Sequence, residues 1–309
     1  MLYWKSKTLL AKIEGVYGSD SGPSAAANAI LATNVQLRPM EGEDVQRNVE
    51  KPYFGASPSI PVGLHSVLTF DIELAGSGAA GTAPGWGPIL RMCAIAETVT
   101  AATSVEYTPI TDDPESGTIY MAIDSIRHVM LGTRGTASFS LNAQGIPTAS
   151  ITLTGLFTLP TTEAKIAPDL SAFQAPLVAT KVNTPLFTIG GQAMRLRDFQ
   201  FDLGNDVQRR FLQNYEGIHI VDRAESLKLQ VEAVALATYN PFSAAILQAS
   251  QVIAFEHGNA AGSKIRFDFP MARQQRLTGY ENQQNIVEWP LNFVPLPDAG
   301  NDQWTITLT

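Results

Sequence analysis

Short runs in which apolar and polar residues alternate are the feature that most restricts the fold of this chain. Leu68–Leu74 alternates without a break, which places four apolar side chains on one face of an extended strand and three polar side chains on the other. Further runs of this kind are Ser138–Leu141, Ile151–Thr154, Leu227–Glu232, Ile265–Phe269 and Trp304–Leu308. Glycine and proline, with 24 and 19 residues, separate the runs and are typical of turns between short strands. We therefore expect a mainly β protein.

Helices are expected at only two places. Pro88–Glu97 and Pro241–Gln251 can each form one short helix, since proline is tolerated in a first turn, where its missing N–H needs no partner. Between them, Thr161–Pro185 holds several prolines and shows little periodicity. We expect a connector without regular structure there.

Four landmarks recur in the same order in the two halves of the chain, with drifting offsets. The pairs are Gly42–Arg47 with Gly204–Arg209, Leu68–Glu73 with Leu227–Glu232, the helix at Pro88 with the helix at Pro241, and Leu156–Pro160 with Phe293–Pro297. Four collinear matches indicate a duplicated β domain. We expect a first domain with an N-terminal arm at residues 1–165, a linker at residues 166–185 and a second domain at residues 186–309.

The charge pattern argues against a protein that grips nucleic acid. The chain has 29 acidic and 21 basic residues, a net charge of −8, and no run of lysine or arginine. Phosphate backbones are bound by clustered cations, so nucleic acid is not an expected ligand. Charged residues make up only 16% of the chain, below the usual quarter, which fits a surface largely covered by partners. No secretory signal and no membrane-spanning stretch is expected.

No motif in the sequence predicts a catalytic, cofactor or metal site. Gly76–Gly81 has the spacing of a dinucleotide fingerprint, but Thr82–Pro88 follows it and cannot form the required helix, so we expect a flexible exposed loop. The four histidines are scattered without the close pairs of a zinc site. The single cysteine, Cys93, lies in an apolar segment and is expected in the core.

Several phrases of the first half, in one order, resemble the major tail tube protein of long, non-contractile-tailed bacteriophages. The phrases are Leu9–Asp20, Leu37–Gly42, Pro52–Pro58, the glycine loop with Trp86–Arg91, and Gly132–Phe139 followed by Pro147 and Thr154–Phe157. They cover most of residues 1–160. The second half is similar more weakly, through Val182–Pro185 and Pro290–Phe293.

The resemblance implies a non-catalytic structural subunit with two tandem β-sandwich or barrel domains, each with a short flanking helix. Tail tube subunits form rings that stack into a hollow tube for genomic DNA, commonly with six tube domains in a ring. Two domains per chain then imply trimeric rings with pseudo-sixfold symmetry. The expected partners are further copies, other tail proteins at the tube ends, and DNA that passes without specific binding. We expect the virion tail as location, after synthesis in the host bacterial cytoplasm, and no membrane contact.

Two groups of residues are candidates for roles in such a tube. The polar faces of the repeated strands could line the lumen, where carboxylates would repel the DNA backbone. The Gly- and Pro-rich segment Asn48–His65 is expected to be a long loop, and Lys51–Ile60 is expected to reach a neighbouring subunit or ring. The lumen candidates are Asp71, Glu73, Gln230 and Glu232, and the loop candidates are Lys51, Tyr53, Phe54, Ser57 and Ile60.

Two alternatives stay open from the sequence. A β-sandwich adhesin or carbohydrate-binding module would present exposed loop aromatics, for which Trp86 and Tyr53 are the candidates. A glycoside hydrolase would require two carboxylates in one pocket.

Overall fold

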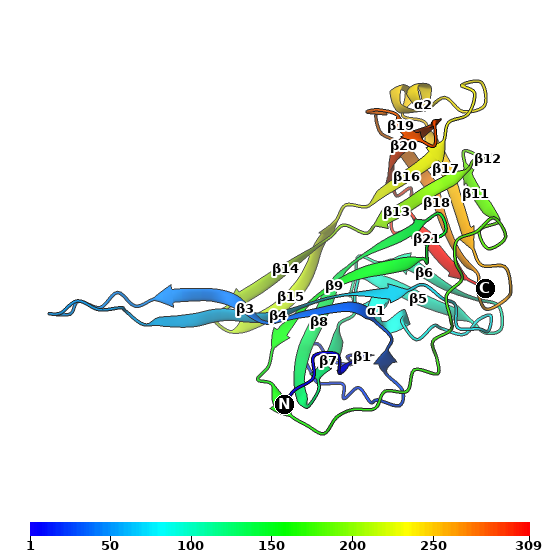
Figure 1. Cartoon of the computed structure of the whole chain (residues 1–309). Helices are drawn as coiled ribbons and strands as arrows, with labels where there is room; N and C mark the ends of the chain where they lie inside the picture. The colour runs from blue at the N-terminus through cyan, green and yellow to red at the C-terminus, as the bar shows by residue number, and fades with distance from the viewer.

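The computed structural model describes residues 1–309 and places 51% of them in strands and 4% in helices. The expectation of a mainly β fold is thus confirmed. Figure 1 shows an elongated molecule with the N-terminus near one end and helix α2 at the other. A long hairpin projects sideways from the body, away from the C-terminus.

The first half of the chain supplies ten strands and one helix. They are β1 (Lys7–Ile13), β2 (Ala29–Ile30), β3 (Thr33–Gln46), β4 (Ser59–Glu73), α1 (Gly87–Arg91), β5 (Ile95–Thr100), β6 (Ser104–Pro109), β7 (Gly117–Ile123), β8 (Ile126–Asn142), β9 (Thr148–Phe157) and β10 (Thr161–Thr162).

The second half supplies eleven strands and one helix. They are β11 (Leu186–Ile189), β12 (Gln192–Ala193), β13 (Leu196–Asp202), β14 (Asn205–Leu212), β15 (Tyr215–Arg223), β16 (Ser226–Glu232), α2 (Pro241–Leu247), β17 (Ser250–His257), β18 (Ile265–Gln274), β19 (Glu281–Gln283), β20 (Ile286–Pro295) and β21 (Thr305–Leu308).

The two halves contain the same order of paired strands. In the first half the antiparallel order is β3, β4, β9, β8, and in the second half it is β13, β16, β20, β18. The C-terminal part of β8 also pairs with β13, so that Phe139 lies opposite Phe201 and Asn142 lies opposite Asp198. The two four-stranded sheets are thereby joined into one continuous sheet of eight strands.

One face of the eight-stranded sheet is apolar and carries the core. Leu68 and Phe70 of β4, Leu229 of β16 and Phe199 of β13 belong to a single cluster of 47 buried residues that spans both halves. The same cluster contains side chains of β6, β7, β17, β21 and α1, so these elements pack against the apolar face. In this second layer β6 pairs with β21, which links the halves a second time.

The alternating runs form strands with the predicted faces. Leu68, Phe70, Ile72 and Leu74 are at most 4% exposed. The five further runs also lie in strands, although Trp304 stands just before β21.

Both helices lie where they were expected but are shorter than predicted. α1 ends at Arg91 and α2 ends at Leu247. Ala94 and Gln248, which follow them, have left-handed backbones with φ of 56° and 50°, and a left-handed residue ends a helical path. The remaining parts of the predicted segments then enter β5 and β17.

The connector between the halves has no helix or strand from residue 163 to residue 185, as expected, whereas Thr161–Thr162 forms β10 and pairs with β8. The loop Gly76–Gly81 is exposed at Gly78 and Ala79, as expected, but Gly76 is buried, because the loop packs against the second half. Gly78 N donates to Gly262 O at 3.0 Å, and a Cβ added to Gly76 would stand 2.0 Å from the same oxygen. Only glycine permits this approach of two backbones. The nearest helix, α1, begins at Gly87, so the loop does not meet a helix N-terminus.

Two long hairpins leave the eight-stranded sheet at the same relative place in each half. β3 and β4 form the first hairpin, whose tip comprises residues 47–58 and projects beyond the body (Figure 1). The expectation of a loop throughout Asn48–His65 is wrong for Ser59–His65, which pairs with β3 as part of β4. The second hairpin, β14 and β15, lies across the first half, where Arg209 Nη1 donates to His65 Nε2 at 2.8 Å.

Candidate assembly surfaces

The face of the eight-stranded sheet opposite the core is polar from β4 to β20. β8 and β9 contribute mainly hydroxyl groups to it, because serine and threonine occupy the positions between their buried residues. Asp71 of β4 accepts hydrogen bonds from Ser150 Oγ at 2.6 Å and from Asn34 Nδ2 at 2.7 Å. Glu73 lies two residues further along β4, opposite Thr148. The two first-half lumen candidates are therefore on this face.

The two second-half candidates lie on the same face but take part in ion-pair networks. Gln230 Nε2 donates to Glu288 Oε2 at 2.7 Å, and Arg197 Nε donates to Glu288 Oε1 at 2.6 Å. The Arg197 guanidinium holds the pKa of the Glu288 carboxyl below its usual range. Glu232 is paired with Arg195. These networks neutralise part of the acidic charge that the sequence suggested for this strand.

Sequence reasoning missed two carboxylates on the polar face. Asp198 and Asp202 of β13 flank the β8–β13 junction, opposite Asn142 and Ser138. Burial raises the pKa of Asp198. The alternation within Leu196–Asp202 was the signal that could have placed them, since Phe199 and Phe201 point to the opposite, apolar face.

The eight-stranded sheet ends in edges that have no partner within the chain. β3 pairs only with β4, so its other edge is free. At the opposite end of the sheet, β20 pairs with β18 along one part of its length and with β19 along another, and β19 has no further partner. Unpaired edges of this kind are templates for pairing with another chain.

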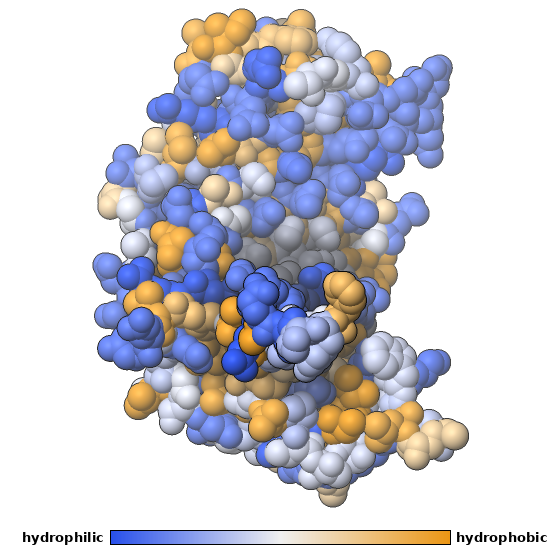
Figure 2. All heavy atoms as spheres, turned by 90° about the vertical axis from the view of Figure 1, so that its left-hand side faces the viewer, coloured by the Kyte–Doolittle hydropathy of each residue, from blue (hydrophilic) through white to orange (hydrophobic).

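The β3–β4 hairpin presents the loop candidates. Lys51, Tyr53, Phe54 and Ile60 are exposed, and Ser57 is partly exposed. Ile60 belongs to β4, where it pairs with Val45, and not to the loop itself. Figure 2, which looks toward the side from which the hairpin projects, shows apolar and polar side chains mixed along it. Phe54 is fully exposed, at 107%, and exposed aromatic side chains on a projecting tip indicate a contact surface.

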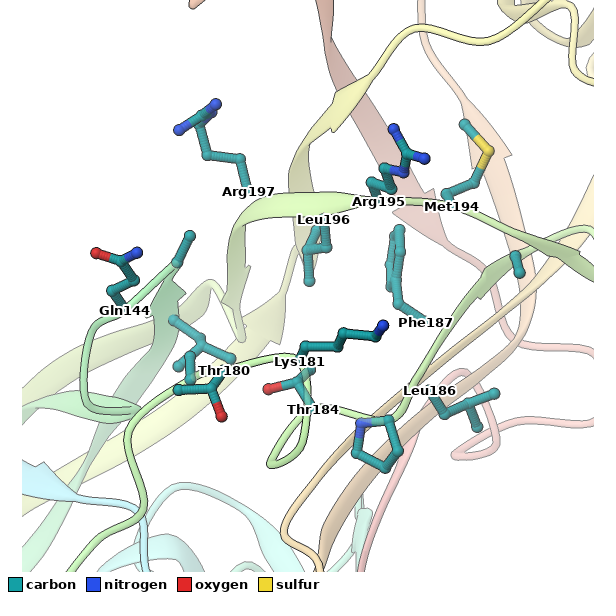
Figure 3. A pocket seen from close by; sticks show the side chains of 15 residues that line it. Gln144, Thr180, Lys181, Thr184, Leu186, Phe187, Met194, Arg195, Leu196 and Arg197 are labelled. Atoms are coloured by element: carbon teal, nitrogen blue, oxygen red, sulfur yellow. The ribbon is translucent and has the colours of Figure 1, made fainter.

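A pocket with a volume of about 530 Å³ lies beside the β8–β13 junction. Phe187, Leu196 and the linker residues Thr180 and Lys181 line it. Figure 3 shows Arg195 and Arg197 pointing away from Thr180, and both bind glutamates on the polar face. No carboxylate and no histidine lines this pocket.

The histidines and the cysteine have structural surroundings. A hydrogen bond of 2.7 Å joins His219 Nε2 and Tyr215 Oη, and His257 Nε2 lies 3.0 Å from Leu177 O. Cys93 is fully buried, and burial raises the pKa of its thiol to about 12, so its placement in the core is confirmed. No group of three or more histidine, cysteine, aspartate or glutamate side chains is placed to hold a metal ion. Neither helix is long and apolar enough to cross a membrane.

A two-layered β body with one polar sheet face, free sheet edges and a projecting hairpin is typical of a structural assembly subunit. Residues 4–300 match the family model of the phage tail tube proteins, and the chain belongs to this family. Membership implies a structural protein of the virion tail that assembles into a tube together with other tail proteins. It does not favour the adhesin or carbohydrate-binding alternative. No match is found among curated proteins.

Proposed function

We propose that this protein is the tube subunit of a long, non-contractile phage tail, and that copies of it form stacked rings through which the genome is delivered. The β8–β13 junction is the observation that carries this proposal. Within one chain it already joins two similar sheets edge to edge, with the apolar face covered and the polar face continuous. Repetition of the same junction between chains would close a barrel and remove the free edges.

The strand order supplies a register for the junction between chains. β3 occupies in the first half the place of β13 in the second half. β18 and β19, which both pair with β20, together occupy the place of β8, and β19 corresponds to the C-terminal part of β8. We therefore propose that Asn34–Arg38 of one chain pairs antiparallel with Gly279–Gln283 of the next. Gln36 would lie opposite Glu281, as Gln200 lies opposite Ser140 within the chain.

The number of chains in a ring follows from the duplication. The common strand order of the two halves supports tandem tube domains at residues 1–165 and 186–309, connected by residues 166–185. If six tube domains surround the channel, three chains form a ring with pseudo-sixfold symmetry. A closed cyclic arrangement of this kind uses one heterologous interface throughout.

The polar sheet face is proposed to line the channel. Asp71, Glu73, Asp198 and Asp202 give it an acidic character, and the serine and threonine side chains between them carry no charge. Such a wall repels phosphates, and two of its cations, Arg195 and Arg197, are paired with glutamates, so DNA would pass without specific binding. The projecting hairpin, with Lys51, Tyr53, Phe54, Ser57 and Ile60, is proposed to contact a neighbouring subunit or ring.

No catalytic step belongs to this function, and the proposed location is the virion tail, after synthesis in the host bacterial cytoplasm. Other tail proteins would cap the two ends of the tube.

Mass measurement of isolated rings, combined with negative-stain microscopy, tests the proposal. We expect hollow rings or tubes whose ring mass equals three chains of 33.3 kDa. Six chains per ring would contradict the trimer, and a protein that stays monomeric at high concentration would contradict the tube function.

A further inference from the structure

The two helices end at equivalent places in the two halves. β7 pairs with β8 as far as Thr133, and just beyond, Gly135 N donates to Met92 O at the end of α1 at 3.1 Å. β17 pairs with β18 as far as Arg273, and just beyond, the Gln248 side chain at the end of α2 donates to Gln274 O at 3.1 Å. In each half, the end of the helix therefore bonds to the edge of β8 or β18 just beyond the point where pairing with β7 or β17 stops.

The end of α1 is covered by the base of the second-half hairpin. Asn205 Nδ2, at the start of β14, donates to Cys93 O at 2.8 Å and to Gly135 O at 3.0 Å. Arg223, at the end of β15, donates to Ala94 O at 2.7 Å. Ile89 and Leu90 of α1 are fully buried.

Nothing in the chain covers the end of α2. Ile246 and Leu247 are 81% and 72% exposed, and Phe242 is 40% exposed. Arg273, which pairs with Ser250 just after the helix, and Arg276, three residues further on, are exposed and form no ion pair. Figure 2 shows apolar side chains gathered at the upper end of the molecule, where Figure 1 places α2. We call Phe242, Ile246, Leu247, Arg273 and Arg276 the α2 end face.

The first-half hairpin has a matching base that is itself uncovered. Its segment Gly42–Arg47 repeats Gly204–Arg209, so Glu43 stands at the position of Asn205. Glu43 is exposed and has no ion pair, and the nearby Val45 and Val62 are 52% and 39% exposed. An acidic and apolar hairpin base thus complements a basic and apolar end face.

We propose that the α2 end face binds the base of the β3–β4 hairpin of a second copy, as the β14–β15 base binds the end of α1 within the chain. This inference rests on the proposed ring assembly and names the surface that receives the hairpin. Gln274 stands at the position of Gly135, because each lies opposite the residue that pairs with the repeated Leu227 or Leu68. Glu43 of one chain then lies near Arg276, two residues beyond Gln274 in the next chain. The occupant is a copy of this chain because the chain carries both complementary surfaces and satisfies neither by itself.

A charge exchange tests the docking. We expect Glu43→Arg and Arg276→Glu each to raise the protein concentration needed for ring formation at least tenfold, as measured by sedimentation, and the double variant to restore assembly. Lys165→Glu, an exposed charge change just before the linker, is the matched control and should assemble normally. The docking alone would be overturned if the wild type forms rings and Arg276→Glu forms them at the same protein concentration. It would also be overturned if the double variant needs as high a concentration as the single variants. A monomeric wild-type chain would overturn both the ring function and the docking.

A disulfide trap provides a second readout. Glu43→Cys mixed with Ala249→Cys should give a cross-linked dimer under mild oxidation, because these positions correspond to Asn205 and the residues after α1. Glu43→Cys mixed with Gln144→Cys, whose site lies on the exposed β8–β9 turn, should give at least tenfold less dimer. Equal yields from the two mixtures would contradict the proposed contact. The native Cys93 does not interfere, since it is buried.

Discussion

Phe139 of the first half and Phe201 of the second half lie directly opposite each other in the β8–β13 junction, with ring centroids 5.9 Å apart and planes 12° from parallel. Both side chains are at most 1% exposed, and Phe267 packs edge-on against both. This aromatic contact stabilises the junction at which the sheets of the two halves meet. Offset aromatic pairs of this kind add to the stability gained from burial.

Phe201→Ala should lower the free energy of unfolding by about 3–5 kcal/mol, because it leaves a cavity at the junction of the halves. Denaturant unfolding, followed by circular dichroism, measures this loss. Phe54→Ala on the exposed tip is the matched control and should change the free energy by less than about 0.5 kcal/mol. A loss below about 1 kcal/mol for Phe201→Ala would show that the junction is not a central part of the core.

The Glu288 carboxyl should make stability depend on acid pH. Its pKa is lowered in the folded protein, first by the hydrogen bonds from Arg197, so its stabilising contribution is present above the unfolded pKa near 4.5 and is lost as the pH falls below it. Glu288→Gln should therefore flatten the loss of stability below about pH 4.5, as unfolding curves at several pH values would reveal. If Glu288→Gln loses stability at acid pH as steeply as the wild type does, Glu288 is not a source of this pH dependence.

The Cys93 thiol should be inert in the native protein. It is fully buried, and its pKa is raised to about 12, so almost no thiolate forms at neutral pH. A thiol reagent should react at least 100-fold more slowly with the native chain than with the chain unfolded in denaturant. Rapid native labelling would mean that the segment after α1 opens often.

Removal of the hairpin tip should separate folding from assembly. Replacing residues 48–57 by an Asn-Gly turn keeps Arg47 and Pro58, which are joined by a backbone hydrogen bond of 3.0 Å. We expect a folded monomer with an unchanged thermal transition that no longer forms tubes in negative stain. Normal tubes from this variant would show that the tip is not an assembly contact.

Reversing charge on the polar sheet face should make the tube retain DNA. Thr69→Lys with Glu73→Lys places two cations on the polar face of β4, the proposed lumen side, where they would attract phosphates. Tubes of this variant should bind DNA in low salt and release it as the salt concentration rises. Asp112→Lys, in an exposed loop away from the polar face and the hairpin tip, is the control, and equal DNA binding by both variants would place the lumen elsewhere.

The sequence by itself determined the strands and their faces. Alternation such as that in Leu68–Leu74 is local, and one buried face is enough to define which side chains point inward. It also located the two helices and a connector without helix or strand. Its phrases resemble those of tail tube proteins, the family whose model matches residues 4–300.

Only the tertiary structure decided how distant segments meet. The β8–β13 junction, the approach of Gly76 to Gly262 and the extension of β4 back to Ser59 all depend on partners far away in the chain. Local patterns contain no information on such partners, because the hydrogen bonds and packing that stabilise them form only once the whole sheet is assembled. The sequence places α1 and α2 at equivalent positions in the two halves. It could not show that α1 is covered and the α2 end face is exposed, because the covering hairpin comes from a distant part of the chain.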